Sequence, residues 1–270
     1  MSLSAISGHL PDRVRDPLRA AFHLSVYARH LANGVEVWRR RNAPATLPPL
    51  RFRNGMIWHH GPFDEPLLML RELYGQRLYD AYRPEPGHRI LDIGANMGAV
   101  SLMWASATPG VTIHAYEPNP QSFQTLTRNI SANGLDAAIV PCNEAVGGGT
   151  GFLDLWVDVP TAHATAFGPA PAEGGRKLAV PQVSLRTAWE RIGGGTLDML
   201  KIDIEGGEVA ALTEDSLPVL AATQRAMIEY HDNLVPGAYE HCMGMLARAG
   251  LACTVRHHPW QEGVITAHRA

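Results

Sequence analysis

The chain has 270 residues, of which 46% are hydrophobic and 18% are charged, and its 23 basic and 26 acidic side chains give a formal net charge of −3. This composition is typical of a globular protein with enough apolar material for a sizeable core. The near-neutral charge argues against a dedicated nucleic-acid-binding protein, because affinity for the phosphate backbone depends on many Lys and Arg contacts.

Cysteine use and hydropathy indicate the cellular compartment of the protein. The three cysteines, Cys142, Cys242 and Cys253, form no C-x-x-C pair, so the sequence predicts neither a disulfide framework nor a cysteine zinc site. Residues 1–16 lack the apolar core of a signal peptide, and no apolar run approaches the ~20 residues of a membrane helix. We therefore expect a soluble, cytoplasmic protein without a membrane span.

Residues 1–86 are expected to form a helical addition in front of the main domain. The predicted elements, in chain order, are a helix over 13–41, an extended segment over 51–58 and a helix over 66–82. Pro84, Pro86 and Gly87 then end the helical pattern. We expect this addition to contact the substrate or to mediate a homo-oligomer.

Residues 87–270 alternate short apolar strands with helical stretches, a pattern typical of a parallel sheet covered on both faces. The expected strands are 89–93, 111–116, 138–140, 199–204 and 225–231, followed by an antiparallel pair, 252–257 and 263–268. The first helix is expected to end near Ser106, and further helices are expected over 120–133 and 239–249. Between the third and fourth strands, a detour over 151–183 contains a long loop, 160–175. This order of seven strands predicts an α/β, class I (Rossmann-like) methyltransferase fold rather than a dehydrogenase domain.

The first strand runs into a glycine turn that is typical of a nucleotide site. Gly94 and Gly98 stand four residues apart between a strand and a helix, where the backbone can approach a ligand closely. A dinucleotide site would have G-x-G-x-x-G, but Asn96 occupies the middle position. Asp92 would repel a pyrophosphate and suits the amino group of a methionine. The turn therefore favours S-adenosylmethionine over NAD.

A second acidic residue supports adenosine binding. Glu117 ends the second strand, 23 residues after Gly94 (117 − 94), where a carboxylate can accept both ribose hydroxyls. Asn143 and Glu144 follow the third strand, where the adenine amine is expected. Their alternative interpretation is a capped polar turn.

Six short segments carry a resemblance to a known family. They are L-D-I-G-A-N-M-G (91–98), Y-E-P-N-P (116–120), R-N (128–129), N-G-L (133–135), K-I-D-I-E-G-G-E (201–208) and I-E-Y-H (228–231). Together they resemble the FkbM family of S-adenosylmethionine-dependent methyltransferases. The resemblance implies a class I fold and, usually, O-methylation of a sugar or secondary-metabolite hydroxyl. Gly207 departs from the alanine that is frequent in the family, and residues 1–86 match no family motif.

Ionisable residues near the ends of the fourth and fifth strands are the candidate catalytic groups. Lys201, Asp203 and Glu205 alternate with apolar residues, which predicts that they share one face of the fourth strand. Such charges either pair with one another or act in the reaction. Asp203 and Glu205 are expected to orient the reacting groups. On the fifth strand, His231 is the candidate general base, and its alternative is a hydrogen-bonding histidine at a strand end.

Lys201, Glu229 and Trp260 are the expected substrate contacts. A metal-free site is expected, and the alternative is a divalent metal bound by Asp203, Glu229 and His231. The sequence thus predicts an S-adenosylmethionine-dependent O-methyltransferase that acts on a small molecule. N-methylation of a small amine and a non-catalytic, cofactor-binding assembly subunit are the alternatives.

Overall fold

The computed structural model describes residues 12–61, 64–157, 175–258 and 261–269. The chain divides into two compact units, Met1–Arg83 and Pro84–Ala270. Among the described residues, no helix combines the length and the apolar character needed to cross a membrane.

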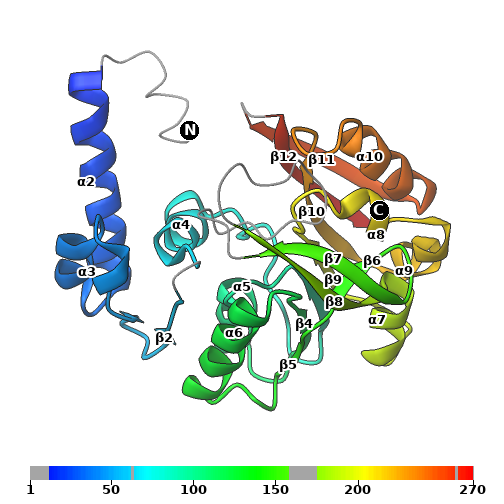
Figure 1. Ribbon diagram of the computed structural model, residues 1–270, viewed down its shortest axis with the longest axis horizontal. Helices are drawn as coiled ribbons and strands as arrows, with labels where there is room; N and C mark the ends of the chain where they lie inside the picture. The colour runs from blue at the N-terminus through cyan, green and yellow to red at the C-terminus, as the bar shows by residue number, and fades with distance from the viewer. Residues whose placement is uncertain (1–11, 62–63, 158–174, 259–260, 270) are drawn as a thin grey trace. The chain divides into compact units, whose positions relative to one another are not determined.

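The first unit consists mainly of helices (Figure 1). Its elements are α2 (Asp12–His30), α3 (Gly34–Arg40), η1 (Pro44–Thr46), β1 (Leu50–Arg51), β2 (Ile57–Trp58), α4 (Pro66–Leu70) and the π-helical turn η2 (Arg71–Gln76).

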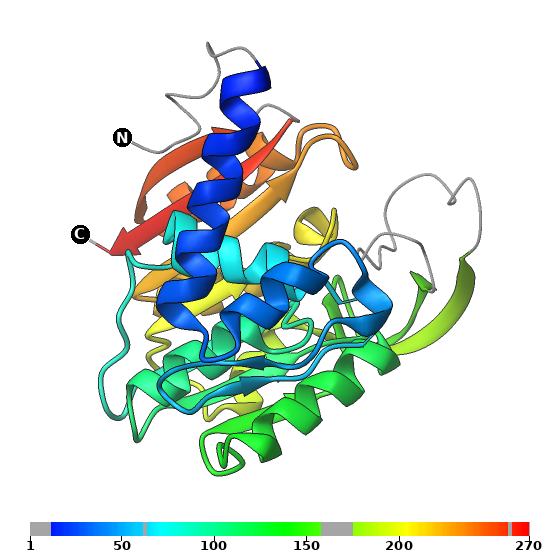
Figure 2. The same cartoon turned by 90° about the vertical axis from the view of Figure 1, so that its left-hand side faces the viewer.

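The single helix expected over residues 13–41 is wrong, because the chain forms two helices there. Figure 2 shows α2 and α3 at an angle to each other. Asn33 holds the break, since its side chain donates to the Pro49 carbonyl at 3.0 Å and accepts from the Arg51 amide at 3.0 Å. A Cβ on Gly34 would lie 2.5 Å from the Tyr27 carbonyl oxygen, so the close approach of the two helices requires glycine.

The two other N-terminal elements are shorter than expected. The extended segment 51–58 is a small antiparallel hairpin, β1 with β2. The helix expected to reach residue 82 ends at Gln76, because Arg77 adopts a left-handed conformation with φ 58°. Phe52, Trp58 and Tyr74 pack their rings together, with the Phe52 and Trp58 centroids 4.6 Å apart.

The second unit is built around the seven-stranded sheet that the sequence predicts. Its spatial order is β11-β12-β10-β9-β3-β4-β5, in which β12 is antiparallel to both neighbours and the other pairs are parallel. The strands are β3 (Arg89–Ile93), β4 (Thr112–Tyr116), β5 (Ile139–Cys142), β9 (Met199–Ile202), β10 (Arg225–His231), β11 (Leu251–His258) and β12 (Glu262–Arg269). The class I methyltransferase topology is therefore confirmed.

Helices connect and cover the strands. They are α5 (Ala99–Ala107), α6 (Pro120–Ala132), α7 (Leu185–Arg191), α8 (Glu208–Ala211), η3 (Glu214–Ser216), α9 (Leu217–Ala222) and α10 (Ala238–Arg248). Alternate residues of β3, β9 and β10 form one buried cluster with α7, α9 and α10. The intervening residues, which include Asp92 and Lys201, face the other side of the sheet, because side chains alternate along a strand.

The detour between the third and fourth main strands forms a separate small sheet. Its spatial order is β6-β8-β7, with β6 (Ala145–Gly147), β7 (Gly151–Val157) and β8 (Arg176–Ser184). The long loop expected over 160–175 lies outside the described residues apart from Gly175.

Candidate functional site

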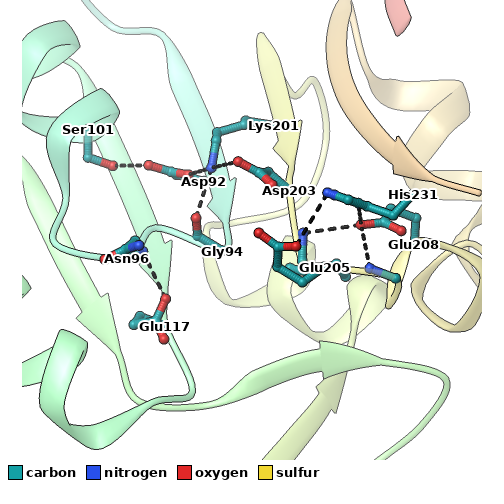
Figure 3. A network of polar contacts seen from close by, with 12 residues as sticks. Asp92, Gly94, Asn96, Ser101, Glu117, Lys201, Asp203, Glu205, Glu208 and His231 are labelled. Atoms are coloured by element: carbon teal, nitrogen blue, oxygen red, sulfur yellow. Dashed lines mark hydrogen bonds and ion pairs between the residues drawn. The ribbon is translucent and has the colours of Figure 1, made fainter. Parts of the chain in front are cut away.

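The candidate site lies where β3, β4, β9 and β10 end. Figure 3 shows the polar side chains that gather there. Asp92 on β3 and Lys201 on β9 are direct partners in the parallel register, and Lys201 is paired in turn with Met227 on β10. Open α/β sheets bind ligands at this carboxyl edge.

A buried ion pair joins the two central strands. The Lys201 Nζ lies 3.0 Å from Asp92 Oδ1, and it donates to the Gly94 carbonyl oxygen at 2.8 Å. Ser101 on α5 donates to the other oxygen of Asp92 at 2.6 Å. Asp92 is 0% exposed and Lys201 is 3% exposed. Burial by itself lowers the pKa of Lys201, but the charges of Asp92 and Asp203 outweigh burial, and the pKa is raised.

Burial and pairing change two of the roles expected from the sequence. Lys201 does not fit a substrate contact, because its ammonium group is enclosed by Asp92, Gly94 and Asp203. Asp92 likewise faces Ser101 and Lys201 rather than an open position for a methionine amino group. The ion-pair interpretation of Lys201 is correct, but its main partner is Asp92.

The turn after β3 requires its glycines. Gly94 has φ +82°, and a Cβ there would lie 1.8 Å from the Asp203 carbonyl oxygen. Gly98 has φ +89° and precedes α5, and a Cβ there would lie 2.5 Å from the Leu126 side chain. Asn96 between them is also left-handed, with φ 50°. The turn thus brings its backbone close to the end of β9.

Glu117 is held firmly just beyond β4. One carboxylate oxygen accepts from the Asn96 amide at 2.8 Å, and the other accepts from the Asn119 amide at 2.8 Å. Asn96 Oδ1 is buried without a hydrogen-bond partner among the described residues. A carboxylate oxygen can accept more than one hydrogen bond, so Glu117 beside the glycine turn suits a ligand that offers hydroxyl donors, as the ribose of S-adenosylmethionine does.

Asn143 and Glu144 have different surroundings. The Asn143 amide donates to the Glu117 carbonyl at 2.8 Å and to the Pro118 carbonyl at 3.2 Å, so this side chain borders the Glu117 segment. Glu144 forms an ion pair with Arg191 on α7. Asn143 therefore stays with the predicted cofactor residues, whereas Glu144 already has a strong partner.

Asp203, Glu205 and His231 form a compact cluster. Each offers one ligand atom within 4.8 Å of those of the other two. The His231 Nε2 lies 3.5 Å from a Glu205 oxygen. The fourth strand ends at Ile202 rather than at 204, and Glu205 lies in a turn with φ 52°. The prediction that Glu205 belongs to the strand face is therefore wrong.

Glu229, one of the expected substrate contacts, does not belong to this cluster. Glu229 lies on β10. Burial lowers the pKa of Lys201, whereas the charges of Asp92 and Asp203 and, with a smaller effect, that of Glu229 raise it. The metal ligand set considered from the sequence included Glu229, but the fold places Glu205 beside Asp203 and His231 instead. Trp260 lies outside the described residues.

The sequence interpretation missed Glu208, which opens α8. Its side chain is 0% exposed. One oxygen accepts from the Ile204 and Gly206 amides at 3.2 and 3.3 Å and lies 3.0 Å from His231 Nδ1. Its sequence signal is the E-G-G-E spacing, which places a second carboxylate three residues after Glu205. Glu208 thus holds both the Glu205 turn and the imidazole.

The carboxylates decide the protonation of His231. Burial alone lowers its pKa, but the bond to Glu208 and the charges of Glu208, Glu205 and Asp203 raise it from 6.5 to about 10. His231 is therefore an imidazolium at neutral pH. The pairing of the imidazolium with these carboxylates adds to the free energy of unfolding. This contribution is fully present below pH 6.5, the ordinary pKa of histidine, and is lost as the pH rises through about 10.

Comparison with known proteins places the chain among methyltransferases. A family model described as the methyltransferase FkbM domain matches residues 92–250, more than half of the chain. The 31-O-demethyl-FK506 methyltransferase FkbM of Streptomyces tacrolimicus is 24% identical over 244 residues, which cover 79% of this chain and 92% of that protein. Methyltransferase sdnD of Sordaria araneosa is 26% identical over 180 residues, which cover 55% and 68% of the two chains.

A solved structure supports the fold alone. The METTL16 MTase domain superimposes with a TM-score of 0.50 at 15% identity, over 100% of this chain and 99% of that domain. This likeness agrees with the class I strand order described above.

Replacing Lys201 by Met should destabilise the protein by about 3–5 kcal/mol, because it leaves the buried Asp92 carboxylate unpaired. The matched control is Lys177→Met, since the chain's other lysine is 55% exposed beside Asp154, and the loss there should stay below about 1 kcal/mol. The free energy of unfolding in urea measures both. Equal losses would contradict the structural role of Lys201, and adding Asp92→Asn should restore part of the loss.

Replacing Glu208 by Gln should lower the pKa of His231 by about 1–3 pH units, because Gln keeps an acceptor oxygen but removes the adjacent charge. Imidazole ¹H–¹⁵N spectra recorded across pH measure the titration, and His231→Gln identifies the signal among the 13 histidines. Glu214→Gln, whose side chain is 75% exposed, is the surface control and should leave the titration unchanged. An unaltered His231 pKa in Glu208→Gln would exclude Glu208 as the group that sets it.

Proposed function

Since this chain belongs to the FkbM methyltransferase family, we propose that it is an S-adenosylmethionine-dependent O-methyltransferase that acts on a hydroxyl group of a small molecule, such as a sugar or a secondary metabolite. The observation that carries the proposal is the orientation of Glu117 by the Asn96 and Asn119 amides beside the glycine turn. The Streptomyces relative, whose name refers to 31-O-demethyl-FK506, supports a small-molecule hydroxyl as acceptor.

Five residues would hold the cofactor: Gly94, Asn96, Gly98, Glu117 and Asn143. The glycines keep side-chain atoms away from the turn, while the Glu117 oxygens and Asn96 Oδ1 offer acceptors for hydroxyl groups. When bound, S-adenosylmethionine supplies a methyl group activated by a positively charged sulfur.

The cluster at the ends of β9 and β10 would act on the acceptor. Transfer of the methyl group to a hydroxyl oxygen would require that this oxygen be aligned with the methyl carbon and that the hydroxyl proton be removed. Neutral His231 would accept this proton at Nε2, because Glu208 lies at Nδ1. Asp203 and Glu205 would orient the hydroxyl group, and such alignment accounts for much of the acceleration in displacement reactions.

Isothermal titration should show binding of S-adenosylmethionine and none of NAD. Glu117→Gln should weaken this binding about ten- to hundredfold, because it replaces charge-assisted hydrogen bonds by weaker ones. Glu214→Gln, at an exposed ion pair with Arg248, should bind like the unaltered protein. Binding of NAD in preference to S-adenosylmethionine would refute the assignment of the turn.

Release of S-adenosylhomocysteine, measured with a panel of hydroxylated acceptors, should rise with pH by about tenfold per unit and level off near pH 10, because the neutral fraction of His231 rises up to its pKa. His231→Gln should lower the maximal rate by about 10²–10⁴-fold and leave the affinity for S-adenosylmethionine nearly unchanged. An unchanged rate in His231→Gln would remove His231 as the base. Transfer to amines but to none of the hydroxyl acceptors would replace O-methylation by N-methylation.

A further inference from the structure

A cavity lies at the carboxyl end of β10, between the start of α10 and the hairpin of β11 and β12. Its volume is about 480 Å³, within the usual range for small-ligand sites. Its walls include Tyr230, Tyr239 and His257, with Asp232 and Glu240 at the side of the helix. None of these residues has a part in the methyl transfer proposed above.

The main wall depends on one glycine. Tyr230, Gly263 and His257 are successive partners across β10, β12 and β11. A Cβ on Gly263 would lie 2.7 Å from the Tyr230 hydroxyl and 2.9 Å from its ring. Because glycine leaves this space free, the Tyr230 ring lies over β12, and its hydroxyl is 2.6 Å from His257 Nδ1 on the far strand.

Tyr239 on α10 completes the aromatic group. Its ring centroid lies 5.1 Å from that of Tyr230 and 5.3 Å from that of His257. Tyr230 is buried, whereas Tyr239 is half-buried and His257 is exposed. The buried Tyr230 ring therefore supports this wall, and the rings of Tyr239 and His257 line the cavity.

The charge of the lining is negative. Asp232 and Glu240 carry it, and among the described residues no Lys or Arg lines the cavity. One Asp232 oxygen accepts from the Tyr239 amide at 2.9 Å, which fixes the carboxylate beside the rings, and within the part of the chain that the structure describes its second oxygen has no hydrogen bond. Burial first, and then Asp232, Tyr239 and Glu240, raise the pKa of Tyr230, so the field of these carboxylates reaches the aromatic wall.

Aromatic faces beside carboxylates are the surroundings that an organic cation prefers, since the ring quadrupole and the negative charges both attract it while apolar substituents contact the rings. We propose that this cavity binds a protonated or quaternary amine, with Tyr239 and His257 in contact with its carbon atoms and Asp232 opposite its charge. Tyr230 and His231 are neighbours on β10 and point to opposite faces of the strand, so the amine site is separate from the His231 cluster.

Choline and its neutral isostere 3,3-dimethylbutan-1-ol test the proposal, because they share shape and differ in charge. Saturation-transfer difference NMR on the full-length protein should give a saturable curve for choline and none for the alcohol. Tyr239→Phe, which keeps a ring, should bind choline like the unaltered protein. Tyr239→Leu should weaken binding about three- to tenfold.

Asp232→Asn is the second, independent variant. Asn preserves an oxygen that can accept from the Tyr239 amide, so the start of α10 is kept while the charge is lost. Choline binding should weaken about three- to tenfold here. Equal binding of choline and the alcohol, or choline binding that neither Tyr239→Leu nor Asp232→Asn weakens, would overturn the proposal.

The same probe distinguishes the source of the amine. Choline should inhibit methyl transfer competitively with the acceptor if the amine belongs to the acceptor, and it should leave transfer unchanged if the amine belongs to a separate ligand. The binding experiment needs no acceptor and no cofactor. If the proposed O-methylation fails, the result of the choline-binding experiment therefore still holds.

Discussion

The candidate site depends on the buried ion pair between Asp92 and Lys201. Neighbouring parallel strands place the two residues side by side, and burial makes their pairing obligatory, because either charge alone would be costly inside the protein. The ammonium group also donates to the Gly94 carbonyl. One lysine thereby joins β3 to β9 and also fixes the direction in which the chain leaves β3.

That direction determines the remainder of the proposed cofactor site. The turn passes so close to β9 that Gly94 has no room for a side chain beside the Asp203 carbonyl. The amide of Asn96 consequently reaches Glu117, which directly follows β4, the strand next to β3 in the sheet. The carboxylate is thus positioned by the backbone of a turn that the ion pair anchors. A change at Lys201 would be transmitted to Glu117 without any direct contact.

The sequence alone predicted the strand order and the glycine turn, because hydrophobic alternation and glycine spacing are local signals. The role of Glu117 as a ribose ligand stays a prediction. It misjudged features that depend on tertiary contacts. Alternation placed Glu205 on a strand, but the left-handed turn that Glu208 stabilises removes it from there. Asp92 was taken as a ligand group because its partner stands more than a hundred residues away in the chain. The division of the first helix depends on Asn33 and its contacts with a later hairpin, which periodicity does not report.

The charge balance of the candidate site is a local property that the net charge of the chain does not report. Lys201 is largely compensated by Asp92, so it leaves little positive charge for the residues beyond it. The single positive charge of His231 then faces three carboxylates, those of Glu208, Glu205 and Asp203, so negative charge is in excess. Burial and, with smaller effects, the charges of Glu205 and Glu208 raise the pKa of Asp203 against the opposing charges of Lys201 and His231. A ligand that brings positive charge to these strand ends would relieve the repulsion, and the sulfonium and ammonium groups of S-adenosylmethionine carry charge of that sign.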